Sequence, residues 1–167
     1  MKIGLYFGTF NPIHVGHLII ANHMAENSDL EQIWLVVTPH NPHKQKSTLL
    51  DDYQRLHLVH LATEDYPKIK PSDIEFKLAQ PNFTVHTLAH LKDHFPQHEF
   101  SLIMGEDNLN GFHKWKNYES ILDEFPIVVF NRENSEEEVI NGFIGNKYSK
   151  FRLNLSSIEL LNKKTPS

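Results

Sequence analysis

Two histidines near the start of the chain, His14 and His17, have the spacing to act together on a phosphate group. They lie between two apolar runs, residues 2–7 and 18–25, which we expect to form a buried strand and a helix. Residues three apart share one side of a helix, so both imidazoles would lie beside its free N–H groups and the positive end of its dipole. Such a helix start binds phosphate. The loop 8–17, with the sequence GTFNPIHVGH, is therefore the first candidate site.

Composition limits the class of protein. The chain has 167 residues, of which 40% are hydrophobic and 22% charged, as expected of one soluble domain. It contains no apolar run long enough for a transmembrane helix and no signal-peptide pattern. Its net charge of -5, without a basic block, argues against non-specific nucleic-acid binding. Because there is no cysteine, a disulfide framework is excluded, and we expect a cytoplasmic protein without nucleic-acid or membrane partners.

The remaining histidines raise the question of a metal site, because the chain has 12 histidines in all. Three of them, His86, His90 and His94, fall on one stripe of an expected helix. A zinc site needs further ligands that converge in space, and the sequence has neither cysteine nor a His-Glu-x-x-His pattern to supply them. We therefore predict no protein-bound metal and interpret most of these histidines as solvated surface residues.

Expected strands and helices alternate along the chain. The strands are expected at 2–7, 32–38, 72–77, 99–104 and 126–130, with a sixth at 152–155; the helices are expected at 18–25, 51–66, 83–91, 118–124 and 135–143, with a loop at 112–116. This alternation predicts a mostly parallel sheet joined by right-handed crossovers. The fold class is therefore α/β: a Rossmann-like, three-layer α/β/α domain with five or six strands, formed by residues 1–167.

The residue types that could do chemistry gather in the loops that follow the strands. These loops are 8–17, 39–47, 105–107 and 131–132. In parallel sheets, ligands bind beyond the carboxyl ends of the strands, at the point where the strand order reverses. The sequence therefore predicts a ligand site at this edge without reference to any motif.

The loop 8–17 resembles the G-T/S-F-D/N-P-x-H/T-x-G-H signature of the nucleotidyltransferase superfamily. Within it, the chain looks like nicotinate mononucleotide adenylyltransferase, because His14 stands where phosphopantetheine adenylyltransferases usually have threonine. Residues 42–44, 82–88 and 104–109, the last with Trp115 and Lys116 after it, resemble the same family. These motifs occur in the family's order and at its spacing.

The resemblance implies an enzyme that joins ATP and nicotinate mononucleotide into nicotinate adenine dinucleotide and releases pyrophosphate, in NAD biosynthesis. A phosphate oxygen of the mononucleotide attacks the α-phosphorus of ATP in line, without a covalent intermediate. Because the second pKa of such a phosphate is about 6, it is largely ionised at neutral pH and needs no general base. The site must supply positioning and positive charge. Mg²⁺ is implied as a cofactor bound through the ATP phosphates.

The resemblance also implies roles for individual residues. His17 would contact the α-phosphate with His14 beside it, and Asp107 would bind a ribose. The implied ATP-binding residues are Gly8, Thr9, Phe10, His14, Gly16, His17, Gly105, Asp107, Arg132, Ser156 and Ser157; those for the mononucleotide are His43 and Lys44 for its phosphate, Thr84 for the nicotinate carboxylate and Trp115 for the pyridine ring. Arg55 is a further candidate for a phosphate contact.

Plainer interpretations stay open for several of these residues. Lys44 could be an ordinary loop cation, Thr84 a helix cap, Trp115 a core or lid aromatic, Asp107 a turn former and Arg132 a solvated charge. Three functions therefore compete: the nicotinate enzyme, a related transferase such as phosphopantetheine adenylyltransferase, and a non-catalytic nucleotide-binding protein. A preference for the nicotinate over the nicotinamide mononucleotide is the better expectation, and a homo-oligomer is left open.

The sequence departs from the family pattern at two places. His86 stands where aspartate is common. The family closes its site with I-S-S-T/S-x-I-R, whose serines and arginine hold the β- and γ-phosphates of ATP. Here residues 155–161 are LSSIELL, so Ser156 and Ser157 match and Leu161 replaces the arginine. Three explanations stay open: Lys163, Lys164 or Arg132 supplies the missing cation, ATP binds weakly, or the tail is a truncated or altered version of the family's. We expect the chain to lack the family's full C-terminal subregion.

Overall fold

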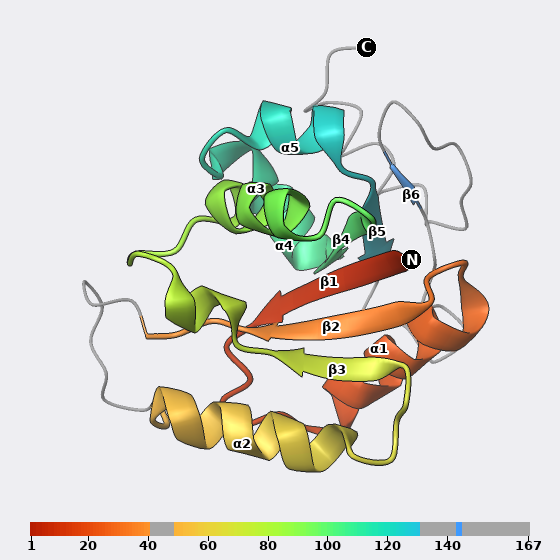
Figure 1. Ribbon diagram of the computed structural model, residues 1–167, viewed down its shortest axis with the longest axis vertical. Coiled ribbons are helices and arrows are strands. Elements are labelled where there is room, and N and C mark those ends of the chain that lie inside the picture. Colours follow the sequence, from red (N-terminus) through yellow and green to blue (C-terminus); the bar gives the residue numbers. More distant parts are fainter. Residues whose placement is uncertain (41–48, 131–142, 145–167) are drawn as a thin grey trace.

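Six strands form one sheet in the part of the chain that the computed structural model describes, residues 1–40, 49–130 and 143–144. The strands lie in the order β3-β2-β1-β4-β5-β6 (Figure 1). Their bounds are β1 Lys2–Gly8, β2 Gln32–Val37, β3 Ile69–Ser72, β4 Glu99–Gly105, β5 Ile127–Phe130 and β6 Phe143–Ile144. Neighbours from β3 to β5 pair in parallel, and β6 pairs antiparallel with β5. The predicted mostly parallel sheet is thus confirmed.

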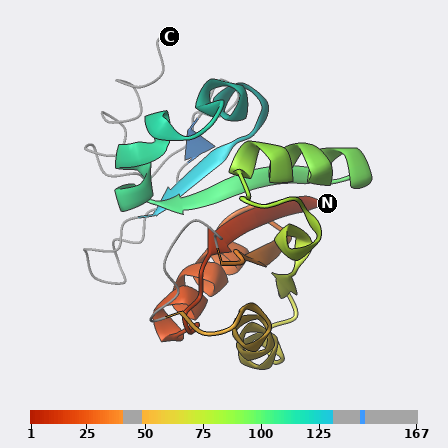
Figure 2. The same ribbon diagram turned by 90° about the vertical axis from the view of Figure 1, so that its left-hand side faces the viewer.

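Helices cover both faces of this sheet. Figures 1 and 2 show α1 (Val15–Asn27) and α2 (Asp52–Thr63) on one side, and α3 (Thr84–His94), α4 (Glu106–Gly111) and α5 (Tyr118–Glu124) on the other. The buried residues form two apolar clusters that match these two layers. Central strands read as nearly continuous apolar runs because both of their faces are buried. The three-layer α/β/α architecture is therefore confirmed.

The strand predicted at 72–77 is wrong. The third strand is β3, and residues Ile74–Lys77 form a short 3-10 helix, η1. The alternation of Ile74 and Phe76 with polar residues suggested a half-exposed strand, but Glu75 is only 2% exposed and points into the protein. The edge position of β3 also explains its Pro71, since an edge strand can leave one N–H site unpaired.

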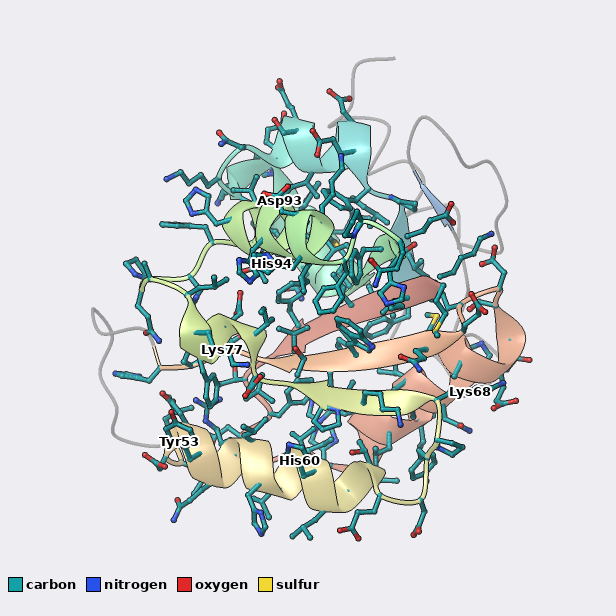
Figure 3. The ribbon with its side chains drawn as sticks, in the orientation of Figure 1. Tyr53, His60, Lys68, Lys77, Asp93 and His94 are labelled. Atoms are coloured by element: carbon teal, nitrogen blue, oxygen red, sulfur yellow. The ribbon has the colours of Figure 1, made fainter. Side chains whose placement is uncertain are left out.

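The 3-10 helix η1 packs against the start of α2. The ring centroids of Tyr53 and Phe76 lie 5.3 Å apart in an edge-to-face contact. Figure 3 shows Tyr53 on α2 with Lys77 of η1 above it. Helix α2 itself ends at Thr63 rather than at residue 66. Its inward stripe is Arg55, Val59 and Thr63, whereas Leu61 is 49% exposed.

Two further elements were not predicted. Residues 106–111 form α4, and residues Phe112–Lys114 within the expected loop form a second 3-10 helix, η2. The helix expected at 135–143 lies outside the described residues except for Phe143, which begins β6, and the strand expected at 152–155 lies outside them entirely. Among the described residues no helix is long and apolar enough to cross a membrane.

Candidate active site

The sequence motif lies where the strand order reverses. From β1 the chain adds β2 and then β3 on one side, and it later crosses to the other side to form β4 and β5. The loop after β1 and the start of α4 after β4 therefore flank the switch point at the carboxyl ends of the strands, which is the expected ligand position in such a sheet. The arrowheads of β1, β2 and β3 mark this edge at the left of Figure 1.

His14 and His17 build the N-terminus of α1 together. His14 is the N-cap residue, and its Nδ1 accepts the backbone N–H of Gly16 at 3.1 Å. The Nδ1 of His17 accepts the backbone N–H of His14, also at 3.1 Å. The two rings stack with their centroids 3.8 Å apart. This reciprocal arrangement is a capping box made by imidazoles in place of a hydroxyl and a carboxylate.

These two hydrogen bonds determine the neutral tautomer of each ring. A ring nitrogen that accepts a hydrogen bond carries no hydrogen, so the proton of each neutral imidazole lies on Nε2. In the neutral form each histidine therefore carries its proton as an Nε2–H, a kind of group that can hydrogen-bond a phosphate oxygen. The capping geometry thus presents a pair of donors at the positive end of the helix.

Phe10 and the glycines of the loop support the histidine pair. The Phe10 ring is buried, and its centroid lies 4.9 Å from that of His17. Its backbone has a φ of 49°, and a Cβ at Gly8 would lie 3.0 Å from its ring. A Cβ at Gly16 would lie 2.9 Å from Cε1 of His14. The side chain of Phe10 thus contacts His17, so a contact between Phe10 and ATP would have to use its backbone.

Arg55, a candidate for a phosphate contact, is fully buried and joins the loops of this edge from within the protein. Its Nη1 donates to the carbonyls of Thr9 at 2.6 Å and Thr38 at 2.8 Å, and its Nε donates to Leu50 at 3.1 Å. Its Nη2 forms an ion pair with Asp52. Arg55 therefore fixes the loops after β1 and β2 against the start of α2.

The start of α3 holds Thr84, a residue predicted to bind the mononucleotide. The helix begins at Thr84 without a side-chain cap, so no capping side chain occupies the N–H groups of Thr84 and Val85. The N-cap residue, Phe83, lies under Lys116, whose Nζ is 4.6 Å from the ring centroid. Trp115 precedes that lysine, is half-buried, and packs edge-to-face on Phe112 with centroids 5.1 Å apart. The structure therefore brings the surroundings of Thr84 and Trp115 together.

Glu75, in η1, is a residue that the sequence interpretation missed, and it contacts the first turn of α3. Its carboxylate accepts a hydrogen bond from the Thr87 hydroxyl at 2.6 Å. Burial raises the pKa of Glu75 above its ordinary value of 4.5, and hydrogen bonds from the side chains of Thr87 and Thr38 partly oppose the rise. The only sequence signal was a glutamate next to apolar residues, which the strand interpretation placed on the outside.

Several predicted site residues cannot be placed by the structure. His43, Lys44, Arg132, Ser156 and Ser157 lie outside the described residues, as do Leu161 and the rest of the unusual C-terminal motif. Gly105 ends β4 as the N-cap of α4, and Asp107 lies in the first turn of that helix. Within the described ranges no three His, Asp or Glu side chains gather as a metal-binding group.

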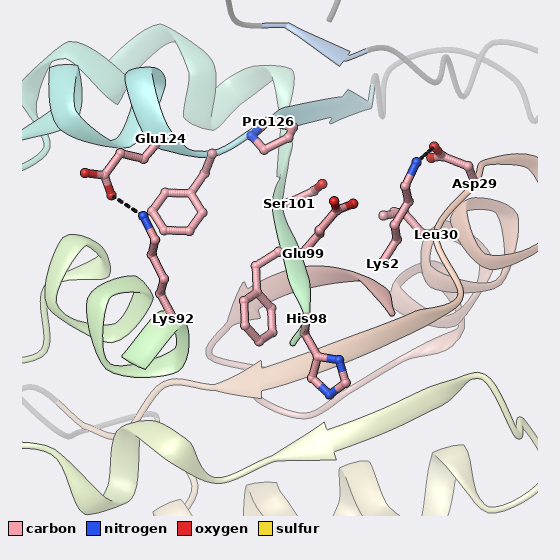
Figure 4. Close-up of a pocket in the computed structure, with 11 residues that line it drawn as sticks. Lys2, Asp29, Leu30, Lys92, His98, Glu99, Ser101, Glu124 and Pro126 are labelled. Atoms are coloured by element: carbon pink, nitrogen blue, oxygen red, sulfur yellow. Dashed lines mark hydrogen bonds and ion pairs between the residues drawn. The ribbon is translucent and has the colours of Figure 1, made fainter. Parts of the chain in front are cut away.

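A cavity at the opposite edge of the sheet is separate from this site. It has a volume of about 220 Å³ and is lined by the first residues of β1 and β4 and by the ends of α3 and α5 (Figure 4). Ion pairs between Lys2 and Asp29 and between Lys92 and Glu124 flank it. All of these segments lie at the amino ends of the strands, so the cavity is not part of the site at the histidine pair.

Comparison with known proteins agrees with this geometry. A family model described as cytidylyltransferase-like matches residues 5–163. The probable nicotinate-nucleotide adenylyltransferase of Flavobacterium psychrophilum is 75% identical over 147 residues, which cover 88% of this chain and 76% of that protein. The chain belongs to the nicotinate-nucleotide adenylyltransferase family. A second member, from Flavobacterium johnsoniae, is 73% identical over 138 residues, covering 83% of this chain and 72% of that protein.

A solved structure has a similar fold. Plasmodium falciparum nicotinic acid mononucleotide adenylyltransferase, complexed with NaAD, gives a TM-score of 0.72 and covers 99% of this chain and 72% of that chain. Its sequence identity is 18%, so the likeness shows the shared fold alone. Family membership nevertheless confirms the resemblance drawn from the loop 8–17 and the later motifs.

Proposed function

We propose that this protein transfers the adenylyl group of ATP to nicotinate mononucleotide, giving nicotinate adenine dinucleotide and pyrophosphate. The observation that carries the proposal is the histidine pair that caps α1 at the switch point of the sheet. The names of the relatives, nicotinate-nucleotide adenylyltransferases, favour nicotinate mononucleotide over phosphopantetheine as the acceptor. The chain contains no cysteine, in keeping with a cytoplasmic enzyme.

The chemistry asks for charge and positioning rather than for a nucleophile. A phosphate oxygen of the mononucleotide forms a bond to the α-phosphorus of ATP, while the bond from that phosphorus to the bridging oxygen breaks and pyrophosphate leaves with the electron pair. Negative charge grows on the oxygens around the α-phosphorus. The Nε2–H donors of His14 and His17, with the helix dipole behind them, are suited to stabilise it.

The second substrate would bind across the edge from the histidines. The uncapped first turn of α3 at Thr84 suits the nicotinate carboxylate, and the Trp115 ring suits the pyridine, with stacking worth about 1 kcal/mol. Mg²⁺ would neutralise part of the phosphate charge. The ion would be held mainly by triphosphate oxygens and water.

One assay tests the proposed function. The protein is incubated with ATP and Mg²⁺ and, separately, nicotinate mononucleotide, nicotinamide mononucleotide or phosphopantetheine, and pyrophosphate release is measured while the product is identified by mass. Release that is fastest with nicotinate mononucleotide is the expected result. Release with phosphopantetheine alone would replace the assignment with the related transferase. ATP binding without release under any acceptor would indicate a non-catalytic nucleotide-binding protein.

A further inference from the structure

Glu75 is a buried carboxylate at the edge of the sheet that carries the candidate site. It is only 2% exposed, although carboxylates are rarely buried without strong partners. It lies in η1, between the end of β3 and the start of α3. Burial also raises its pKa, because the charged carboxylate is less stable in the protein interior than in water. Because burying this carboxylate is unfavourable, its hydrogen-bond partners show what structural role it has.

The contacts of Glu75 join three segments of this edge. Its Oε2 accepts from the Thr87 hydroxyl in α3 at 2.6 Å, and the Thr38 side chain just after β2 also hydrogen-bonds the carboxylate. Its backbone carbonyl accepts from Nδ2 of Asn82 at 3.1 Å, within the connection that leads into α3. Glu75 therefore holds both the connection before α3 and the first turn of the helix.

The position of α3 along its axis depends on this contact. Thr87 lies one turn after Thr84, and its backbone N–H and hydroxyl both contact the carbonyl of the N-cap residue Phe83, at 3.2 Å and 3.4 Å. A shift of Thr87 would therefore move the N–H groups of the first turn of α3, where the proposed function places the nicotinate carboxylate. Because hydrogen bonds to charged groups are short and directional, the carboxylate specifies this position more tightly than apolar packing would.

We propose that Glu75 is a positioning residue which, through Thr87, sets the first turn of α3 for binding the pyridine mononucleotide. The proposal rests on the proposed function and extends it to a residue that touches neither substrate. It concerns one subsite, because the histidine pair belongs to α1, which lies on the other face of the sheet from α3 (Figure 2). Loss of the Glu75–Thr87 bond should then weaken the mononucleotide selectively.

Three threonine variants test the proposal. Thr87→Val removes the hydroxyl with little change in shape, and we expect the KM for nicotinate mononucleotide to rise roughly 10-fold while the KM for ATP and kcat stay within about twofold. Thr87→Ser keeps the hydroxyl and should restore a near-normal KM. Thr63→Val is the matched control, because Thr63 is also buried but donates to the Val59 carbonyl of its own helix.

The double variant Glu75→Gln/Thr87→Val covers the case in which Thr87→Val alone does not fold. The valine variant leaves a buried charge with one partner fewer, whereas the double variant Glu75→Gln/Thr87→Val carries no charge there and should show the same selective rise in KM. The proposal would be overturned if KM rose equally for both substrates, or if Thr63→Val raised the KM for nicotinate mononucleotide as much as Thr87→Val does. It would also be overturned if neither Thr87→Val nor the double variant folded. Absence of turnover in the wild type would instead refute the proposed function.

Discussion

At the scale of single residues, the two nitrogens of each ring in the histidine pair have different roles: Nδ1 caps α1, and Nε2–H is the proposed phosphate donor. Each Nδ1 satisfies a backbone N–H at the start of α1, which leaves Nε2–H as the donor of the neutral ring. We expect His17→Ala to lower kcat by roughly 10²–10³-fold with little change in KM, because the donor acts mainly on charge that grows in the transition state. His60→Ala, on the exposed side of α2, is the control in the same steady-state assay. An unchanged kcat in His17→Ala would contradict the assigned role.

Gly16 tests whether the position of the His14 ring matters. An added Cβ would lie 2.9 Å from Cε1 of His14, so the ring must swing away and lose its bond to the Gly16 N–H. We expect Gly16→Ala to reduce kcat by roughly 10–100-fold while the melting temperature changes little. Gly111→Ala is the matched control, since nothing lies within 4 Å of a Cβ there. Full activity in Gly16→Ala would show that the capping geometry is dispensable.

At the scale of elements, a buried arginine connects the loops that follow β1 and β2 to α2. Arg55 donates to carbonyls in both loops, so its loss leaves several buried acceptors without a donor. We expect Arg55→Met to lower the free energy of unfolding by on the order of 3 kcal/mol. Gln54→Met, on the exposed side of the same helix, should change it by less than about 0.5 kcal/mol. Urea unfolding of both variants measures this, and equal stabilities would contradict the assigned role of Arg55.

The same elements show what the sequence could predict. Strands buried on both faces were found because their apolar runs are unbroken, and the loop 8–17 was found because its spacing is specific to a helix start. The inward positions of Arg55 and Glu75 were missed, since hydropathy assigns charged side chains to the surface. Their burial depends on carbonyls and hydroxyls contributed by distant segments, and no local pattern contains that information.

At the scale of the whole molecule, the candidate site and the cavity lie at opposite ends of the parallel strands. The histidines that cap α1 and the start of α3 lie at the carboxyl ends of the strands, whereas the cavity flanked by two ion pairs lies at the amino ends. The sheet thus places two distant loops on one edge because parallel strands all end on the same side. Glu75 belongs to that edge, and its burial affects the stability of the entire fold.

The pH dependence of that stability follows from the sign of the Glu75 shift. Below its ordinary pKa of 4.5 the side chain is protonated in the folded and the unfolded chain alike. As the pH rises further, the unfolded chain loses this proton first, because burial holds the pKa of the folded group higher. The folded state then binds more protons than the unfolded state, so the free energy of unfolding falls with rising pH until the folded pKa is passed.

Glu75→Gln should remove this component, because its amide stays neutral at every pH. We therefore expect the variant to gain stability relative to the wild type as the pH rises from about 4.5 through the folded pKa, and the difference to become constant above it. Urea unfolding of both proteins between about pH 4.5 and pH 8 measures the difference and cancels the titration of groups that they share. A difference independent of pH would mean that the folded and unfolded pKa values of Glu75 are equal. A difference that moves in favour of the wild type would mean that the two hydroxyls stabilise the carboxylate more than burial destabilises it.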